Sequence, residues 1–452
     1  MRWVGPPTGI SRVENKFALW AATHLPNVAF VFFDPTDLIY RHVVGDAVPF
    51  LSGEAAIDTF GLTNPAMPKM RRTDRIPAPL RQAFLWCTQT RRMTLRKLEM
   101  MRLQAGKTGF AALLDRTQRR LMSDKYRAVM VRDDGTRRPF YPHEMLSGEP
   151  VDFQPSDVLA CVGSGWGHTN IDAIADLKLR IGFRMHLLCH DLIPVMFPEF
   201  YRERDVQLFS KYMRRALAIA DRIVVNSRAV ETDCRNYCRK QGIEPKEIVV
   251  SFLGADMLPA DQTVVPLPDP LVRDRFVLLV STIEPRKGHL LLCEVWRRLI
   301  DDGIPQSKGF KLVFVGRPGW MVDELIATIH RDEKLSKHIV VLPRVSDQTL
   351  AALYRDAAFC VYPSRYEGYG LPVVEAFLYG KPILASSGGA LPELTQDFSP
   401  TIDATDEEAW YTALKSWLLD PSEYQIYTER LRTQYRHPTW SAAAEAFFGG
   451  VA

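Results

Sequence analysis

Two glutamates, Glu367 and Glu375, lie eight positions apart across a Gly-Tyr-Gly-Leu-Pro turn. The turn follows a short apolar run, residues 358–362, which has the length of a buried strand. Its glycines allow close approach of a ligand, and Pro372 suits the start of a helix, whose free N–H groups favour a diphosphate. The spacing predicts a nucleotide-sugar site in which Glu375 accepts from ribose hydroxyls and Glu367 touches the sugar. The alternative is an ordinary strand–turn–helix with two surface glutamates.

A second chemical feature is a pair of adjacent cations, Arg286 and Lys287, in the sequence Glu-Pro-Arg-Lys-Gly. They follow the apolar run 276–280 and precede a helical pattern. Two cations at a strand end suit a diphosphate leaving group, because they neutralise the charge that develops as a glycosidic bond breaks. A solvated charged loop is the alternative.

Three groups in the first half could face the same ligand. His190 and Asp191 follow an apolar run, where they could orient a hydroxyl or bind a sugar, although a buried, hydrogen-bonded histidine is the alternative. A turn at Gly9 precedes a helical pattern. It could place backbone N–H groups and the cation of Arg12 at a phosphate. Another run ends in a loop that could line a cleft, with Ser164 and Trp166, although Trp166 fits a core equally well.

Apolar runs alternate with amphipathic stretches along both halves, which favours α/β domains with parallel sheets. In the first half the expected strands are 28–33, 158–162, 184–189, 222–225 and 248–253, with a helix over 209–220. In the second half they are 276–280, 311–315, 339–342, 359–362 and 382–385, with helices over 289–301, 321–329, 347–354 and 372–379. Ligands of doubly wound sheets bind at the carboxyl ends of the strands. The polar groups after these strands should therefore meet on one rim: 284–287, 316–317, 344–345 and 367–375.

Composition limits the class of protein. A chain of 452 residues is too long for one core, and 46% hydrophobic with 24% charged residues is typical of a soluble globular protein. No apolar run reaches about 18 residues, and the start lacks an apolar signal core. Seven scattered cysteines without a paired CxxC pattern indicate a reducing, cytoplasmic location. The absence of Asp-X-Asp, HExxH and Walker-type motifs predicts a metal-independent reaction.

The charge is uneven. The net charge is only +4, which does not imply a nucleic-acid partner, but residues 69–127 hold sixteen basic against four acidic residues. Leucine and methionine recur there at helical spacing, and a basic amphipathic helix can lie on an anionic membrane surface. A helical insertion with a solvated charged face is the alternative.

The run from Ser281 to Glu393 resembles glycosyltransferase family 4, whose E-x7-E motif is matched by Glu367 and Glu375. That family consists of retaining enzymes with the GT-B fold, two Rossmann-like doubly wound domains with a cleft between them. The first half resembles it more loosely, through TGISR, GSGW, HDLIP, and the pairs Ala220-Asp221 and Asn226-Ser227. Together these are similar to bacterial enzymes that build O-antigen or exopolysaccharide, often mannosyltransferases.

The resemblance implies a role for each matching residue. Lys287 and Arg286 would clamp the donor diphosphate, Glu375 the ribose, and Glu367 would face the transferred sugar. Further donor contacts would come from Gly316, the base-facing Arg344 and Val345, and the N–H groups of Gly370 and Leu371. His190 would lie by the donor sugar and the acceptor hydroxyl, and Gly9 and Arg12 would close over the phosphates. In the retaining mechanism proposed for this family, the leaving phosphate itself takes the acceptor proton.

We therefore expect an N-terminal acceptor domain over 1–258 with a basic insertion around 65–128, a donor domain over 271–434, and a helix over 435–452 that crosses back. The expected reaction moves a hexose, mannose from GDP-mannose, onto a glycan or polyprenyl-diphosphate-linked acceptor, without a cofactor. The expected location is the cytoplasm, at the inner membrane's cytoplasmic face. Alternatives are a GT-B phosphorylase, or an inactive sugar-nucleotide binding subunit, because Ser281-Thr282 stand where many family members carry Gly-Arg.

Overall fold

The computed structural model describes residues 9–34, 39–43, 147–167, 169–256 and 265–450. The predicted insertion around 65–128, with its basic stretch 69–127, lies outside these residues. None of the described helices is both long and apolar enough to cross a bilayer.

The N-terminal domain is built on a four-stranded parallel sheet in the order β4-β5-β6-β7. Its strands are β4 (Val158–Cys161), β5 (Arg184–Cys189), β6 (Arg222–Val225) and β7 (Ile248–Val250). The helices between them are α7 (Ile171–Ile181), the short α8 (Ile193–Met196), α9 (Glu203–Ile219) and α10 (Arg228–Gln241). The predicted strands 184–189 and 222–225 are confirmed with these bounds.

The expectation that residues 28–33 form a parallel strand is wrong. The strand there is β1 (Val31–Asp34), which pairs antiparallel with β2 (Ile39–Val43). Only four residues join β1 to β2, and a parallel neighbour needs a crossover of a dozen or more. β2 pairs in turn with β3 (Ser147–Pro150), so a small antiparallel sheet precedes the parallel one.

The C-terminal domain holds a six-stranded parallel sheet in the order β10-β9-β8-β11-β12-β13. The strands are β8 (Phe276–Val280), β9 (Lys311–Val315), β10 (Ile339–Leu342), β11 (Phe359–Tyr362), β12 (Ile383–Ser386) and β13 (Thr401–Ile402). The first four match the predicted strands residue for residue, because buried parallel strands are continuous apolar runs. The order of addition reverses between β8 and β11, and such a switch point is where doubly wound sheets bind ligands.

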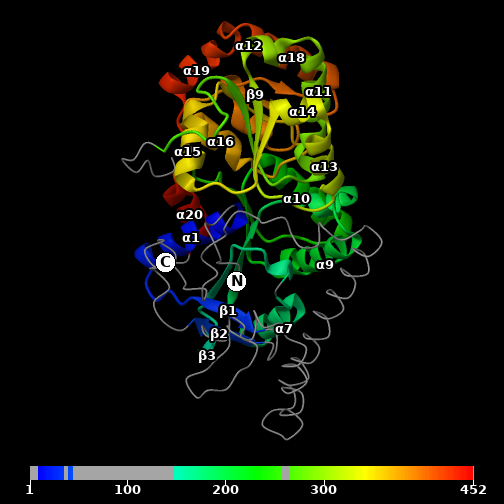
Figure 1. Ribbon diagram of the computed structural model, residues 1–452. Coiled ribbons are helices and arrows are strands. Elements are labelled where there is room, and N and C mark those ends of the chain that lie inside the picture. Colours follow the sequence, from blue (N-terminus) through cyan, green and yellow to red (C-terminus); the bar gives the residue numbers. More distant parts are fainter. Residues whose placement is uncertain (1–8, 35–38, 44–146, 168, 257–264, 451–452) are drawn as a thin grey trace, which may run out of the picture.

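Helices cover both faces of this sheet (Figure 1). They are α11 (His289–Asp301), α12 (Ile304–Lys308), α13 (Asp323–Arg331), α14 (Glu333–His338), α15 (Asp347–Asp356), α16 (Leu371–Leu378), α17 (Leu391–Thr395), α18 (Glu407–Leu419) and α19 (Ser422–Gln434). The predicted cap of α15 is Ser346, whose side chain accepts from the Thr349 N–H. The described part of the chain ends in α20 (Trp440–Phe448).

Helix α20 packs against α1 (Ile10–His24) in the N-terminal domain, as Figure 1 shows. The Phe447 ring meets Phe17 edge to face with centroids 5.5 Å apart, and Phe448 stacks on Trp20 at 5.6 Å. The Phe447 carbonyl also lies 3.2 Å from Nδ1 of His186 on β5. Helix α20 is therefore packed on the N-terminal domain, although it follows the C-terminal domain in the chain.

Replacing Phe447 tests how far this packing stabilises the N-terminal domain. Phe447 and Phe17 are 0% and 1% exposed. Truncating a fully buried phenylalanine costs about 3–5 kcal/mol, because it removes buried area and leaves a cavity. We expect Phe447→Ala to lower the unfolding temperature clearly in calorimetry. Ile426→Ala, at a 60% exposed position, is the control and should stay within about 0.5 kcal/mol of wild type.

Candidate active site

Two loops meet at the switch point of the C-terminal sheet. One follows β8 and forms a single 3-10 turn, Pro285–Lys287. The other, residues 363–370, follows β11 and is called here the Glu367 loop. Gly288 brings them into contact: its φ is 73°, and a Cβ there would lie 2.3 Å from the Pro363 carbonyl oxygen. Only glycine fits this backbone conformation and this close approach.

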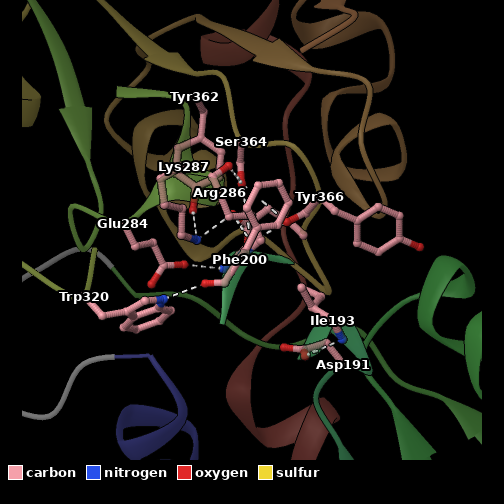
Figure 2. Close-up of polar contacts among 11 residues, drawn as sticks. Asp191, Ile193, Phe200, Glu284, Arg286, Lys287, Trp320, Tyr362, Ser364 and Tyr366 are labelled. Atoms are coloured by element: carbon pink, nitrogen blue, oxygen red, sulfur yellow. Dashed lines mark hydrogen bonds and ion pairs between the residues drawn. The ribbon is translucent and has the colours of Figure 1, made fainter. Parts of the chain in front are cut away.

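Glu367 lies between the two predicted cations. Its Oε1 is 2.5 Å from Nζ of Lys287 and 3.0 Å from a guanidinium nitrogen of Arg286. Lys287 also donates to the Tyr362 hydroxyl at 3.1 Å, as Figure 2 shows. An ammonium has three protons, and these contacts use two of them. Three residues predicted from two separate motifs are thus one cluster of charges.

Arg286 is the buried cation of the cluster and also binds the adjacent backbone. It is 7% exposed and donates to Glu284 at 2.8 Å and to the Tyr366 carbonyl (Figure 2). Burial alone would lower its pKa, but Glu367, Tyr201 and Glu284 outweigh burial and raise it well above the ordinary value. The guanidinium is therefore a permanent positive charge that fixes the backbone next to Glu367.

Burial and pairing act in opposite directions on the other two members. Burial alone would raise the pKa of Glu367, but Arg286 and Lys287 lower it to about 2. Burial and the neighbouring Arg286 lower the pKa of Lys287 more than pairing with Glu367 raises it. Glu367 thus stays ionised at neutral pH, which keeps the cluster neutral enough to be buried.

Glu375 lies in α16, behind the Glu367 loop, and is 5% exposed. Its Oε2 accepts from the Tyr354 hydroxyl at 2.9 Å, and its Oε1 forms an ion pair with Arg12 of α1. Arg12 was predicted to reach a phosphate from the other domain. In the structure it does cross from the N-terminal domain, and the partner it meets is Glu375.

The sequence predicts an anion site at the start of α16. Gly370 precedes the helix with φ 118°, and no side chain caps its first N–H groups. Leu371 and Pro372 occupy the first two helical positions. A Cβ on Gly370 would lie 2.9 Å from the Leu391 side chain. These N–H groups lie between Glu367, in the loop before the helix, and Glu375, one turn into the helix.

His190 and Asp191 reach this region from the carboxyl end of β5. Nε2 of His190 lies 2.6 Å from the Val162 carbonyl, and burial lowers the pKa of the imidazole. Asp191 accepts from the Ile193 N–H at 3.0 Å (Figure 2). A Cβ on Gly368 would lie 2.4 Å from the His190 carbonyl oxygen. The loop that starts at His190 therefore touches the Glu367 loop directly, backbone to backbone.

The remaining predicted residues divide between the rim and the core. Arg344 is exposed and Val345 half-buried after β10, and Gly316 follows β9, where a Cβ would lie 1.8 Å from the Ser281 carbonyl oxygen. Gly9 precedes α1 with φ 54°. Ser164 is half-buried after β4. Trp166 is half-buried and packs against the N-terminal core with its ring centroid 5.0 Å from Phe209, as the core alternative expects.

Several partners of these residues carry no signal in the sequence. Tyr354 and Tyr362 look like ordinary core aromatics, and Glu284 was part of the cation motif without a role of its own. Trp320 donates its indole N–H to the Phe200 carbonyl at 2.6 Å across the two domains (Figure 2). Only the folded arrangement shows that these side chains converge.

Comparison with known families agrees with this geometry. Residues 270–434, which contain the Arg286–Lys287 turn, the Glu367 loop and α16, match the family model described as glycosyl transferases group 1. These residues form a glycosyl transferases group 1 domain. Each of the two domains has a parallel sheet, and the domains meet through the Arg12–Glu375 ion pair between α1 and α16 and through the close backbone approach of Gly368 to His190. This α/β arrangement is the GT-B class predicted from the sequence.

Curated relatives extend the match beyond the glycosyl transferases group 1 domain. The chain is 27% identical over 330 residues to the serotype-specific mannosyltransferase WbdA of Escherichia coli, covering 68% of this chain and 38% of that protein. It is 28% identical over 254 residues to the O-antigen chain mannosyltransferase B of E. coli, covering 56% and 65%. The chain thus spans less than two thirds of these relatives. A solved α,α-trehalose-phosphate synthase (UDP-forming) from Burkholderia vietnamiensis superposes with a TM-score of 0.49 at 14% identity, covering 62% of this chain and 68% of that one.

The pairing of Glu367 predicts an acid-dependent loss of stability. The carboxyl has an ordinary pKa of 4.5 and a value of about 2 in the folded protein. A depressed folded pKa contributes stability above the unfolded value, and this contribution is lost as the pH falls through the folded value. We expect Glu367→Gln to be less stable than wild type at neutral pH, and the difference to shrink between pH 4.5 and pH 2. Urea titrations over this range would measure it. A difference that stays constant with pH would contradict the pairing.

Proposed function

We propose that this chain is a retaining glycosyltransferase of family 4 that moves a hexose from a nucleotide sugar to a glycan acceptor. The donor we propose is GDP-mannose. Two relatives carry mannosyltransferase names, and one of these names refers to the O-antigen chain. The proposed role is therefore the synthesis of a bacterial surface polysaccharide.

The observation that carries the proposal is the charge cluster at the switch point of a glycosyl transferases group 1 domain. Arg286 and Lys287 converge on Glu367, and Glu375 lies one helical turn into α16. Sugar, diphosphate and ribose follow one another in a nucleotide sugar. Carboxylate, cations with helix N–H groups, and a second carboxylate are the groups that would bind them in turn.

The residues suggest how transfer would be assisted. Lys287, with Arg286 behind it, would stabilise the negative charge that develops on the leaving diphosphate. The N–H groups after Gly370 would add to this effect, and Arg12 would approach from the other domain. His190, held with its Nε2 toward a backbone carbonyl, would orient the acceptor hydroxyl. The leaving phosphate would accept the proton of that hydroxyl, so this mechanism needs no protein nucleophile.

We propose that the acceptor is a glycan, free or linked to polyprenyl diphosphate. The basic residues of segment 69–127 would bring the protein to an anionic membrane surface where a lipid-linked acceptor is found. No metal ion is needed in this mechanism, because Arg286 and Lys287 would supply the positive charge.

Ligand-induced stabilisation tests the donor site. GDP-, UDP-, dTDP- and ADP-sugars would be added to the protein in EDTA, and the unfolding temperature recorded. A ligand at 100 times its dissociation constant adds about 2.7 kcal/mol of stability. We expect GDP-mannose to give the largest shift, and Glu375→Ala to abolish it, because the ribose loses its carboxylate.

Glu423→Ala is a matched control, since Glu423 is an exposed glutamate at the start of α19. It should keep the full shift. A shift that requires added magnesium would contradict metal independence. No shift with any nucleotide sugar would overturn the proposed function.

A further inference from the structure

The N-terminus of α10 contacts both loops of the proposed site, the His190 loop and the Glu367 loop. Ser227 is its capping residue and is fully buried. Its hydroxyl accepts from the Val230 N–H at 3.1 Å and donates to the Gly368 carbonyl at 2.8 Å. A hydroxyl has one proton, and Ser227 uses it across the domain boundary, next to Glu367.

The preceding residue holds the opposite loop. Asn226 is 2% exposed, and its Nδ2 donates to the His190 carbonyl at 3.0 Å. That carbonyl is the atom which leaves no room for a side chain on Gly368. Two adjacent side chains, Asn226 and Ser227, therefore bind the backbones of the His190 and Glu367 loops where these loops touch.

The C-terminal domain also contacts the start of α10, through Glu393 of α17. Its carboxylate accepts from the N–H groups of Arg228 at 2.9 Å and Ala229 at 2.6 Å, the first two residues of α10. A negative charge at a helix N-terminus is favourable, and two backbone donors fix its position. Glu393 thus caps a helix of the other domain.

Two further bonds connect this contact to Glu367 itself. The Tyr366 hydroxyl donates to Asp233, one turn further along α10, at 2.6 Å. The Glu367 carbonyl accepts from the Ala390 N–H at 2.9 Å, just before α17. The segment that carries Glu367 is therefore held by α10 on one side and by the start of α17 on the other.

We propose that Asn226, Ser227 and Glu393 are positioning residues that hold the His190 loop in register with the Glu367 loop during transfer. We call these three residues the alignment bracket. The inference rests on the proposed function, because it concerns where the acceptor hydroxyl meets the donor sugar. Donor binding needs mainly Arg286, Lys287 and Glu375 of one domain, whereas transfer needs both loops together. The bracket should therefore affect turnover more than donor affinity.

The test separates these two effects. GDP-mannose binding would be measured by calorimetry, and its transfer to methyl α-D-mannoside by product analysis, in Ser227→Ala and Ser227→Ala/Glu393→Ala. Misplacement of reacting groups by about 1 Å can cost about 100-fold in rate. We expect kcat to fall at least tenfold in the single variant and about 100-fold in the double variant, with the dissociation constant of GDP-mannose changed less than twofold.

Two variants separate positioning from helix capping. Ser227→Thr keeps the hydroxyl and should recover most of kcat. Asp406→Ala removes a cap of the same kind, since Asp406 accepts from the Ala409 N–H at 2.9 Å at the start of α18. It should lower stability as Ser227→Ala does, yet keep wild-type kcat.

Hydrogen exchange supplies a readout that does not depend on activity. Amides of residues 189–192 and 366–368 should exchange faster in the double variant than in Asp406→Ala. Unchanged exchange, a wild-type kcat, or a loss of donor affinity that matches the loss of turnover would each overturn the bracket. If the wild-type protein bound no nucleotide sugar, the proposed function would fall, and hydrogen exchange alone would still decide whether the bracket exists.

Discussion

The buried ion cluster at the switch point is the constraint on which the site depends. Glu367 and Arg286 are 6% and 7% exposed, and buried charges are tolerated only when each has a partner. Arg286 meets this requirement with Glu284 and Glu367, and Lys287 meets it with Glu367. The loops after β8 and β11 must therefore pack together before either can present its charges. Gly288 permits that packing, because a side chain there would collide with Pro363.

The same principle links the two domains. Glu375 would be a second buried carboxylate without a cation in its own domain, and Arg12 supplies the positive charge from α1. Glu393 meets the N–H groups of α10 in a similar way. Polar groups of each domain thus complete the hydrogen bonding of the other. Such contacts are sensitive to small displacements, because charge-assisted hydrogen bonds depend strongly on distance and angle.

Much of the C-terminal domain could be predicted from its sequence. Strands β8 to β11 and helix α11 have the predicted bounds, because each is an apolar run or an amphipathic repeat bounded by polar residues. Helix α9 begins six residues before the expected start at 209, since its first turn is solvated and carries no apolar periodicity. The clustering of Glu367 with Arg286 and Lys287 followed from the rule that parallel strands end at one rim. The partners of Arg12, Ser227 and Glu393 did not, because contacts between residues more than a hundred positions apart depend on how the domains dock.

The course of the chain has a mechanical consequence. The backbone passes from one domain to the other twice, between β7 and β8 and again between α19 and the α20 helix that packs on α1. Two covalent crossings define an axis. Rotation about that axis changes the separation of the His190 and Glu367 loops while both crossings stay in place. The packing of α20 against α1 therefore favours a hinge rotation of one domain relative to the other over the free reorientation that a single linker would allow.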